Sequence, residues 1–220
     1  MDKNIQKEIA QTEGSGVFVQ LGAGAGDLDP RAFNRDGFSE FIKSLPKEKV
    51  KKIVLVEPNP INIPKLKECW KDYPQAEIHQ IAIIPSDHND NTAKFYFCSD
   101  DGPHYQIGSI DKSHNDNSRY RGQKCNEIVV NVEKINSFLE KKVGTDIQLL
   151  AMDIEGMDIP VILDINYDKF KIKYLSFEYL CFNRDKRKDV VFNHLKSKNF
   201  DFLGKGVDHN GYDYLFGNKL

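Results

Sequence analysis

The chain has 220 residues, of which 40% are hydrophobic and 29% charged, a balance that is typical of a folded globular protein and excludes a disordered or fibrous chain. This length favours a single domain over residues 1–220. Lysine and arginine total 31 against 33 acidic residues, a formal net charge of -2, so no overall positive field favours nucleic acid or a membrane surface as the partner. A small-molecule partner is therefore expected.

Neither a secretory signal nor a membrane-spanning segment is expected. Residues 1–13 alternate charged and amide side chains, and no apolar run approaches the roughly 18 residues that a membrane helix needs. The four cysteines form no CxxC pair and have no histidine at zinc-finger spacing. These observations predict a cytoplasmic protein with reduced, structural thiols.

Short apolar runs rich in Val, Ile and Phe alternate with longer helical stretches, which predicts an α/β fold with a largely parallel sheet covered on both faces. The expected strands cover residues 17–21, 53–57, 77–84, 93–99, 127–132, 147–152, 173–178, 200–203 and 212–216. Helices are expected at about 30–44, 61–71, 135–141, 157–163 and 185–197. The pattern makes the last two strands an antiparallel pair.

A polar stretch interrupts this alternation at about residues 100–126. It is rich in Asp, Asn, Ser, Gly and His, so it lacks the apolar area that would order it independently. An inserted loop is expected here, and such loops often close over sites. We therefore predict that this segment is a lid over a ligand site.

Three glycines, Gly22, Gly24 and Gly26, follow the first expected strand and precede a helix. Missing side chains let a ligand approach the backbone amides, although a tight turn can need glycine for its backbone angles alone. Glu57 ends the second strand, where an open α/β sheet places a carboxylate that accepts both ribose hydroxyls. Together the turn and the carboxylate indicate an adenosine site.

A dinucleotide is disfavoured at this turn. The fingerprint of a dinucleotide site is GxGxxG, and the residue three positions after Gly24 is Asp27 rather than glycine. The GxGxG spacing suits a methionine moiety better than a pyrophosphate. A nucleotide-dependent oxidoreductase therefore stays the alternative enzyme.

Asp153 and Glu155 follow an apolar strand in the middle of the chain, at the carboxyl edge where open α/β sheets bind ligands. In a continuing strand both would point to one side, and their repulsion should raise one pKa. We expect Glu155 to be a base or hydroxyl anchor, and Asp153 to contact the cofactor's methionine end or position the acceptor. The structural alternative is that they cap the helix at 157–163.

Four segments in this order resemble the FkbM family of methyltransferases: VFVQLGAGAG at 17–26, VEPNP at 56–60, the alanine at 82 and MDIEG at 152–156. Residues 131–138 are similar to the strand and helix that precede the last of these segments in the family. The resemblance implies a seven-stranded, Rossmann-like methyltransferase sheet, mostly parallel with a C-terminal antiparallel strand. It also implies S-adenosylmethionine as cofactor and O-methylation of a hydroxyl on a sugar, glycan or natural product.

The expected cofactor-binding residues combine the glycine turn, the two acidic strand ends and positions that resemble the family's adenine border and loop serine. They are Gln20, Gly22, Ala23, Gly24, Gly26, Glu57, Pro58, Asn59, Ile81, Ala82, Ser109 and Asp153. Two residues depart from the family: Gln20 stands where Asp is common, and Ala151 stands where Lys is usual. An uncharged Gln20 shifts the expected contact with the methionine ammonium toward Asp153 or backbone carbonyls.

His104 completes the expected catalytic set with Asp153 and Glu155, because histidine titrates near neutrality and this one lies in the polar stretch. His114 lies in the same stretch and is the weaker candidate. No His/Asp/Glu cluster has ligand spacing, so no metal is predicted. A protein that senses S-adenosylmethionine without turnover is the alternative from another functional class.

Overall fold

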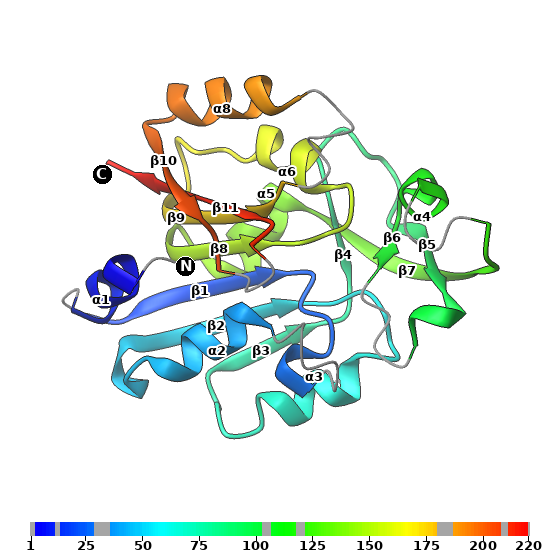
Figure 1. Cartoon of the computed structure of the whole chain (residues 1–220), viewed down its shortest axis with the longest axis horizontal. Helices are drawn as coiled ribbons and strands as arrows, with labels where there is room; N and C mark the ends of the chain where they lie inside the picture. Colours follow the sequence, from blue (N-terminus) through cyan, green and yellow to red (C-terminus); the bar gives the residue numbers. More distant parts are fainter. Residues whose placement is uncertain are drawn as a thin grey trace.

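The computed structural model describes residues 3–11, 14–28, 36–102, 107–117, 122–179, 187–207 and 211–219. A seven-stranded sheet in the order β10-β11-β9-β8-β1-β2-β3 forms the centre of the molecule (Figure 1). Its strands are β1 (Gly16–Leu21), β2 (Val50–Val56), β3 (Ala76–His79), β8 (Asp146–Met152), β9 (Lys171–Glu178), β10 (Phe200–Lys205) and β11 (Asp213–Asn218). Neighbours from β9 to β3 are parallel, whereas β11 is antiparallel to both β9 and β10. The sheet is therefore mixed, and the predicted antiparallel pair at the end of the chain is confirmed.

Helices cover both faces of this sheet, as expected for an α/β fold (Figure 1). One face carries α1 (Lys3–Gln11), α2 (Gly37–Ser44) and α3 (Ile63–Cys69), and the other carries α5 (Ile135–Phe138), α6 (Asp158–Asp164) and α8 (Lys188–Ser197). Strand β1 feeds both cores, because Val17 and Val19 pack on the α6 side and Phe18 on the α2 side. A strand buried on both faces reads as a continuous apolar run, which is why the sequence located it.

A second sheet stands beside the first (Figure 1). Its order is β4-β7-β5-β6. The strands are β4 (Ala82–Ile84), β5 (Thr92–Cys98), β6 (Gly108–Ser109) and β7 (Cys125–Lys134). All four come from one stretch of chain between β3 and β8, so this sheet is a contiguous addition to the central one.

The single strand expected over residues 77–84 is wrong. The chain leaves the central sheet after His79, where β3 pairs in parallel with β2. It resumes at Ala82 in the second sheet, where β4 pairs with β7. The sequence alone could not show that the chain changes sheets here. Both β3 and β4 fall within the single stretch expected to be a strand, and only Gln80 and Ile81 separate them.

The polar stretch at 100–126 contains regular structure in its described part. The strand β6 and the helix α4 (Lys112–Asn117) lie within it. The short helical turns of the chain are η1 (Gly26–Leu28), η2 (Lys47–Lys49), η3 (Ser99–Asp101) and the π-helical turn η4 (Leu139–Val143) that continues α5. The first parts of the helices expected at 30–44 and 185–197 lie outside the described residues, and α2 and α8 fill the rest.

Helix α1 has no counterpart among the expected elements. Its sequence is strongly polar, yet Ile9 is buried and Ile5 packs beside it against the α2 core. The hydroxyl of Tyr174 donates to Glu8 at 2.7 Å, which ties α1 to β9. No helix in the described ranges is long and apolar enough to cross a membrane. Among those ranges Cys69, Cys98 and Cys125 are free thiols, as expected.

Candidate active site

The glycine turn leads directly out of β1, and each of its glycines has a positive φ: +82° at Gly22, +53° at Gly24 and +62° at Gly26. A Cβ at Gly22 would lie 1.8 Å from the carbonyl oxygen of Asp153, and one at Gly26 would lie 2.5 Å from the Cys69 Sγ. At Gly24 no described atom lies within 4 Å of the same position. Gly22 and Gly26 are thus needed for packing, whereas Gly24 leaves the open space through which a ligand can approach.

An ion pair behind the turn holds it in place. Lys43 Nζ lies 2.9 Å from Asp27 Oδ2 and donates to the carbonyl oxygen of Cys69 at 2.9 Å. Asp27 belongs to η1, Lys43 to α2 and Cys69 to α3. The turn is therefore fixed by the two helices that flank it.

Glu57 follows β2 and is only 5% exposed. Its carboxylate accepts hydrogen bonds from the backbone N–H groups of Gly24 and Asn59, both at 2.8 Å, and from Asn62 Nδ2 at 3.5 Å. Burial raises the pKa of Glu57 to about 7, although the hydrogen bonds from Asn59, Gly24 and Asn62 lower it. A carboxylate has about four lone-pair positions, so about one remains for a ligand.

Gln20 ends β1 beside the turn and is almost fully buried. Its Nε2 donates to Asp36 Oδ1 at 2.9 Å, while Gln20 Oε1 is buried with no hydrogen-bond partner among the described residues. Asp36 is the N-cap of α2 and accepts from the backbone N–H groups of Phe38 and Ser39. A carboxylate therefore stands next to Gln20, and a buried acceptor oxygen remains available there.

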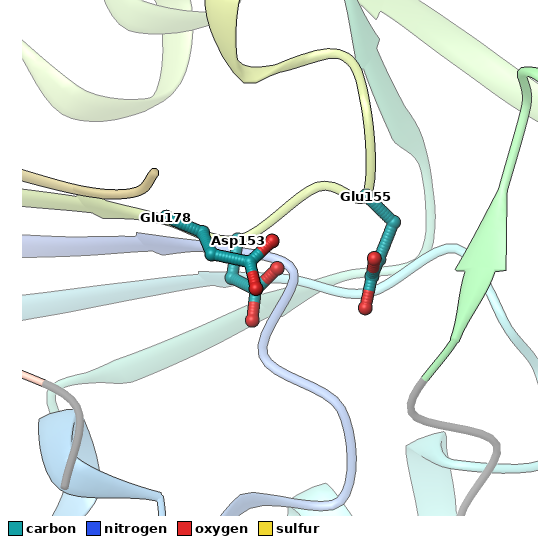
Figure 2. A group of neighbouring side chains, drawn as sticks. All are labelled: Asp153, Glu155 and Glu178. Carbon is teal, nitrogen blue, oxygen red and sulfur yellow. The ribbon is translucent and has the colours of Figure 1, made fainter. Parts of the chain in front are cut away.

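Three carboxylates gather at the carboxyl ends of β8 and β9. One oxygen each of Asp153, Glu155 and Glu178 lies within 4.8 Å of the others. Figure 2 shows Asp153 and Glu178 side by side, with Glu155 on the loop that follows Asp153. The backbone N–H of Asp153 donates to the carbonyl oxygen of Leu21 at 3.0 Å, so these carboxylates lie directly beside the glycine turn.

The repulsion expected between these carboxylates raises the pKa of Asp153. Burial raises its pKa well above the ordinary value, and the charges of Glu178, Glu155, Asp158 and Asp213 raise it further. No described residue hydrogen-bonds the buried Oδ1 of Asp153. Both effects favour the protonated form more than in an ordinary aspartate, and a protonated carboxyl group can donate a hydrogen bond to a bound group.

Glu155 does not continue the strand, because its φ is +50°. Its carbonyl oxygen accepts from Ser109 Oγ at 2.6 Å, and its Oε2 lies 2.6 Å from His114 Nε2. Burial lowers the pKa of His114, but the carboxylate of Glu155 and the charges of Asp158 and Asp111 outweigh it, so the pKa is raised overall. The second sheet and α4 thus meet the central sheet at this loop.

Capping of α6 by Asp153 or Glu155 is not what the structure shows. The N-cap position of α6 is Met157, and no side chain caps it by a hydrogen bond. Asp158, inside the first turn and 1% exposed, accepts instead from the backbone N–H of Ile154 at 3.3 Å. Burial raises the pKa of Asp158 to about 6. Neither carboxylate caps α6: Glu155 is paired with His114, and Asp153 Oδ1 has no hydrogen-bond partner among the described residues.

The remaining expected site residues fall in different places. His104 lies outside the described residues. Asn59 is buried and bonds Glu57, Ala23 packs in the α2 core, and Ala82 and the neighbouring Ile81 pack in the apolar clusters beside the sheets. Ser109 is 1% exposed, and its hydroxyl holds the Glu155 carbonyl.

The sequence argument missed Glu178 and did not foresee the contact that His114 makes. Glu178 ends the predicted strand at 173–178, so the rule that led to Asp153 could have found it too. The sequence named His114 only as the weaker histidine candidate, and it could not reveal the contact with Glu155, because that contact joins segments that lie far apart in the chain and depends on the fold of the second sheet. Asp153, Glu155 and Glu178 are also the described side chains that could surround a cationic group.

Comparison with known proteins identifies the family. The model of the methyltransferase FkbM domain matches residues 20–214. No curated protein sequence matches the chain. A crystal structure of methyltransferase FkbM from Methylobacillus flagellatus KT is similar at a TM-score of 0.50 and 12% identity, with 92% of this chain and 43% of that chain covered. The chain thus spans less than half of the length of that relative.

Two further solved structures are similar to the chain. The methyltransferase domain of METTL16 has a TM-score of 0.50 at 6% identity, over 99% of this chain and 66% of that one. The Streptococcus mutans protein SMU.1697c, in complex with SAH, has a TM-score of 0.45 at 11% identity, over 97% and 94%. At such identities the likeness of the first two structures shows the fold, whereas the domain match covers most of the sequence. The chain belongs to the FkbM family of methyltransferases.

Proposed function

We propose that this methyltransferase transfers a methyl group to a hydroxyl of a sugar, glycan or natural-product acceptor. The observation that carries the proposal is the contact between Gly22 and Asp153, which places the glycine turn against the carboxylates of the β8 and β9 ends. A cofactor on the turn and an acceptor at the carboxylates would then be neighbours. Holding two reactants together in this way is the main rate advantage a methyltransferase needs.

S-adenosylmethionine is the cofactor, as membership of the family implies, and when bound it supplies an electrophilic methyl group. The residues fit this group: Gly24 leaves open space above the turn, and Glu57 retains about one acceptor position for a ribose hydroxyl. Accepting from both hydroxyls would require Glu57 to release a present hydrogen bond. Pro58, Asn59, Ile81 and Ala82 remain the proposed border of the adenosine.

Gln20 is proposed to receive the ammonium group of the methionine moiety. Its Oε1 is a buried acceptor with no described partner, and Asp36 beside it supplies the negative charge that glutamine lacks. An ammonium group at this place would satisfy the oxygen and lie close to Asp153 at the end of the neighbouring strand.

Asp153 and Glu155 take different roles on the acceptor side of the proposal. Asp153 has a raised pKa, so its protonated form can donate a hydrogen bond that orients the acceptor or the methionine end. Glu155 is paired with His114, and its carboxylate is proposed to accept the proton of the acceptor hydroxyl. We propose His104 as a further contact to the acceptor, on its sequence position alone.

The segment at 100–126 is proposed as the acceptor-side lid, a small-molecule or glycan as the partner, and the cytoplasm as the location. Nucleic acid is not a proposed partner, because the net charge of -2 gives no overall attraction to phosphates. Metal is not part of the proposed reaction.

Two measurements test the function. Calorimetry should show binding of S-adenosylmethionine and its demethylated product but not of NAD. Mass spectrometry after incubation with S-adenosylmethionine and a pooled panel of hydroxylated sugars and metabolites should show a product heavier by one CH₂. Cofactor binding without a product from any hydroxyl acceptor would support the sensing alternative, and NAD binding would contradict the proposed cofactor site.

A further inference from the structure

The backbone at Glu155 is held in an unfavourable shape by the second sheet and its helix. A φ of +50° is uncommon for any residue with a side chain, and such residues persist only where surrounding contacts hold them. Two contacts do so here: Ser109 Oγ donates to the Glu155 carbonyl, and His114 Nε2 pairs with the Glu155 carboxylate, both at 2.6 Å. Both partners come from one short stretch, β6 and α4.

The surroundings of His114 leave room for its imidazole and hold its helix in place. Gly156 has a φ of +99°, and a Cβ there would lie 3.1 Å from His114 Nδ1, so the glycine leaves room for the imidazole. Asn115, the next residue of α4, donates from Nδ2 to the carbonyl oxygen of Tyr96 in β5 at 3.0 Å, and Asn115 is 1% exposed. The helix is thus anchored to the second sheet directly beside the histidine.

We propose that His114 is a positioning residue of the methyl-transfer site, which fixes the carboxylate of Glu155 beside Asp153 and Glu178. This inference rests on the proposed function. The pair is formed between side chains that are 18% and 15% exposed, where a charge-assisted hydrogen bond is stronger and better oriented than at the surface. The acidic groups near the imidazole besides Glu155 are Asp158 and Asp111, and Glu155 is the one in direct contact.

The competing explanation is that the pair only ties α4 to the central sheet. Substitutions that separate these two explanations are His114→Ala, which removes the contact, and His114→Gln, whose amide N–H can still donate to Glu155. The matched control is Asp116→Asn, an exposed position on the same helix. Turnover is measured by mass spectrometry with the pooled hydroxylated panel, and cofactor affinity by calorimetry with S-adenosylmethionine.

His114→Ala should lower turnover about tenfold, the effect of losing one charge-assisted hydrogen bond in the transition state. Affinity for S-adenosylmethionine should stay at the level of the Asp116→Asn control, and His114→Gln should recover most of the rate. In a Glu155→Gln background, His114→Ala should cost no further rate, because the group that it positions is already disabled. Unchanged turnover in His114→Ala, or an equal loss in both backgrounds, would overturn the inference.

A second measurement needs no acceptor. The imidazole signals of His114 are followed by NMR titration in the wild type, in Glu155→Gln and in Asp116→Asn. The pKa of His114 should fall in Glu155→Gln alone, and an identical titration in all three proteins would refute the pair. Absence of S-adenosylmethionine binding in the wild type would instead refute the proposed function, so the two failures are distinguishable.

Discussion

At Glu57, three N–H groups compete with a ligand for the lone pairs of one buried carboxylate. Glu57→Ala should weaken binding of S-adenosylmethionine by roughly 1.5–3 kcal/mol, the range for hydrogen bonds to a charged group, or about 10–100-fold. Because the pKa of Glu57 is raised to about 7, and the ionised form is the better acceptor, affinity should increase as the pH rises from about 6 to 8.

Calorimetry across this pH range checks both parts of the prediction. Glu57→Gln should remove the pH dependence, and Glu68→Gln, an exposed glutamate on α3, is the control that should preserve it. Unchanged affinity in a folded Glu57→Ala protein would remove Glu57 from the ribose site.

Two glycines of one turn offer a matched pair of alanine substitutions. Gly22→Ala places a Cβ 1.8 Å from a backbone oxygen at positive φ, so it should cost roughly 2–4 kcal/mol of folding free energy. Gly24→Ala meets open space and should cost only about 1–2 kcal/mol, from its backbone angle alone. Its Cβ would instead occupy the ligand's approach, so its main effect should be on cofactor affinity.

Thermal unfolding and calorimetry on the two proteins distinguish these effects. If Gly24→Ala binds S-adenosylmethionine as tightly as the wild type, the open space above the turn is not the cofactor site.

The carboxylates of Asp153 and Glu155 are expected to respond differently to amide substitution. Glu155→Gln should lower the methylation rate by roughly 10²-fold or more, the lower range of general-base effects, with cofactor binding nearly unchanged. Asp153→Asn should weaken binding and turnover together, since Asp153 lies beside the glycine turn. Single-turnover rates and cofactor affinities are the measurements, with circular dichroism to confirm folding. If both proteins keep the wild-type rate, Asp153 and Glu155 have no catalytic role.

Most of the site residues at the strand ends could be predicted from the sequence, because a single rule about parallel sheets applies to all of them. Parallel strands end at the same edge of a sheet, so Gly22, Glu57 and Asp153 could be placed together without a structure. The same rule does not say how their side chains are used, and the hydrogen bonds of Glu57 to its own neighbours were not foreseen. His114 was only the weaker histidine candidate, and its contact with Glu155 could not be predicted, because that contact depends on tertiary packing.

At the scale of elements, α4 and β6 belong to the described part of the 100–126 segment and lie beside Glu155. If the segment is the acceptor-side lid, limited proteolysis within it should slow several-fold when S-adenosylmethionine and the acceptor are both bound, because binding lowers the population of open forms. Mass spectrometry of the fragments locates the cuts, and cleavage near α1 serves as the internal control. A protein lacking the centre of the segment that still methylates its acceptor would contradict the lid.

The boundaries of elements were predicted best where burial is two-sided and worst where the chain changes sheets. Strands β1 and β8 have continuous apolar sequences, and their predicted and observed limits nearly coincide. The split of residues 77–84 into β3 and β4 depends on which strand each half pairs with, and pairing is a long-range property. Helix α1 was missed because its sequence is mostly polar, although Ile5 and Ile9 lie one helical turn apart and both pack against the core.

At the scale of the whole molecule, the carboxyl group of Asp153 should lower the free energy of unfolding as the pH rises. The pKa of Asp153 in the folded protein is above its ordinary value of 3.8, so folding disfavours the ionised form. The contribution of Asp153 to the free energy of unfolding is therefore fully present below about pH 3.8 and is lost as the pH rises through the folded pKa. Asp153→Asn has no such charge and should be more stable than the wild type at pH 8, with the difference shrinking toward pH 4.

Denaturant unfolding at several pH values tests this expectation, with Asp116→Asn as the control that should show no such trend. A constant difference between Asp153→Asn and the wild type from pH 4 to 8 would show that the charge of Asp153 is not what opposes folding.

The second sheet is one contiguous stretch of chain, inserted between β3 and β8 of the central sheet. The glycine turn, Glu57 and Asp153 belong to the central sheet, whereas Ser109 and His114 belong to the insertion. Sequence change within the insertion can therefore remodel the surroundings of Glu155 while leaving the cofactor turn untouched. In evolutionary terms, a lineage could acquire new acceptors by altering a single exchangeable segment, and a chimaera that receives this segment from a relative should inherit the relative's acceptor preference.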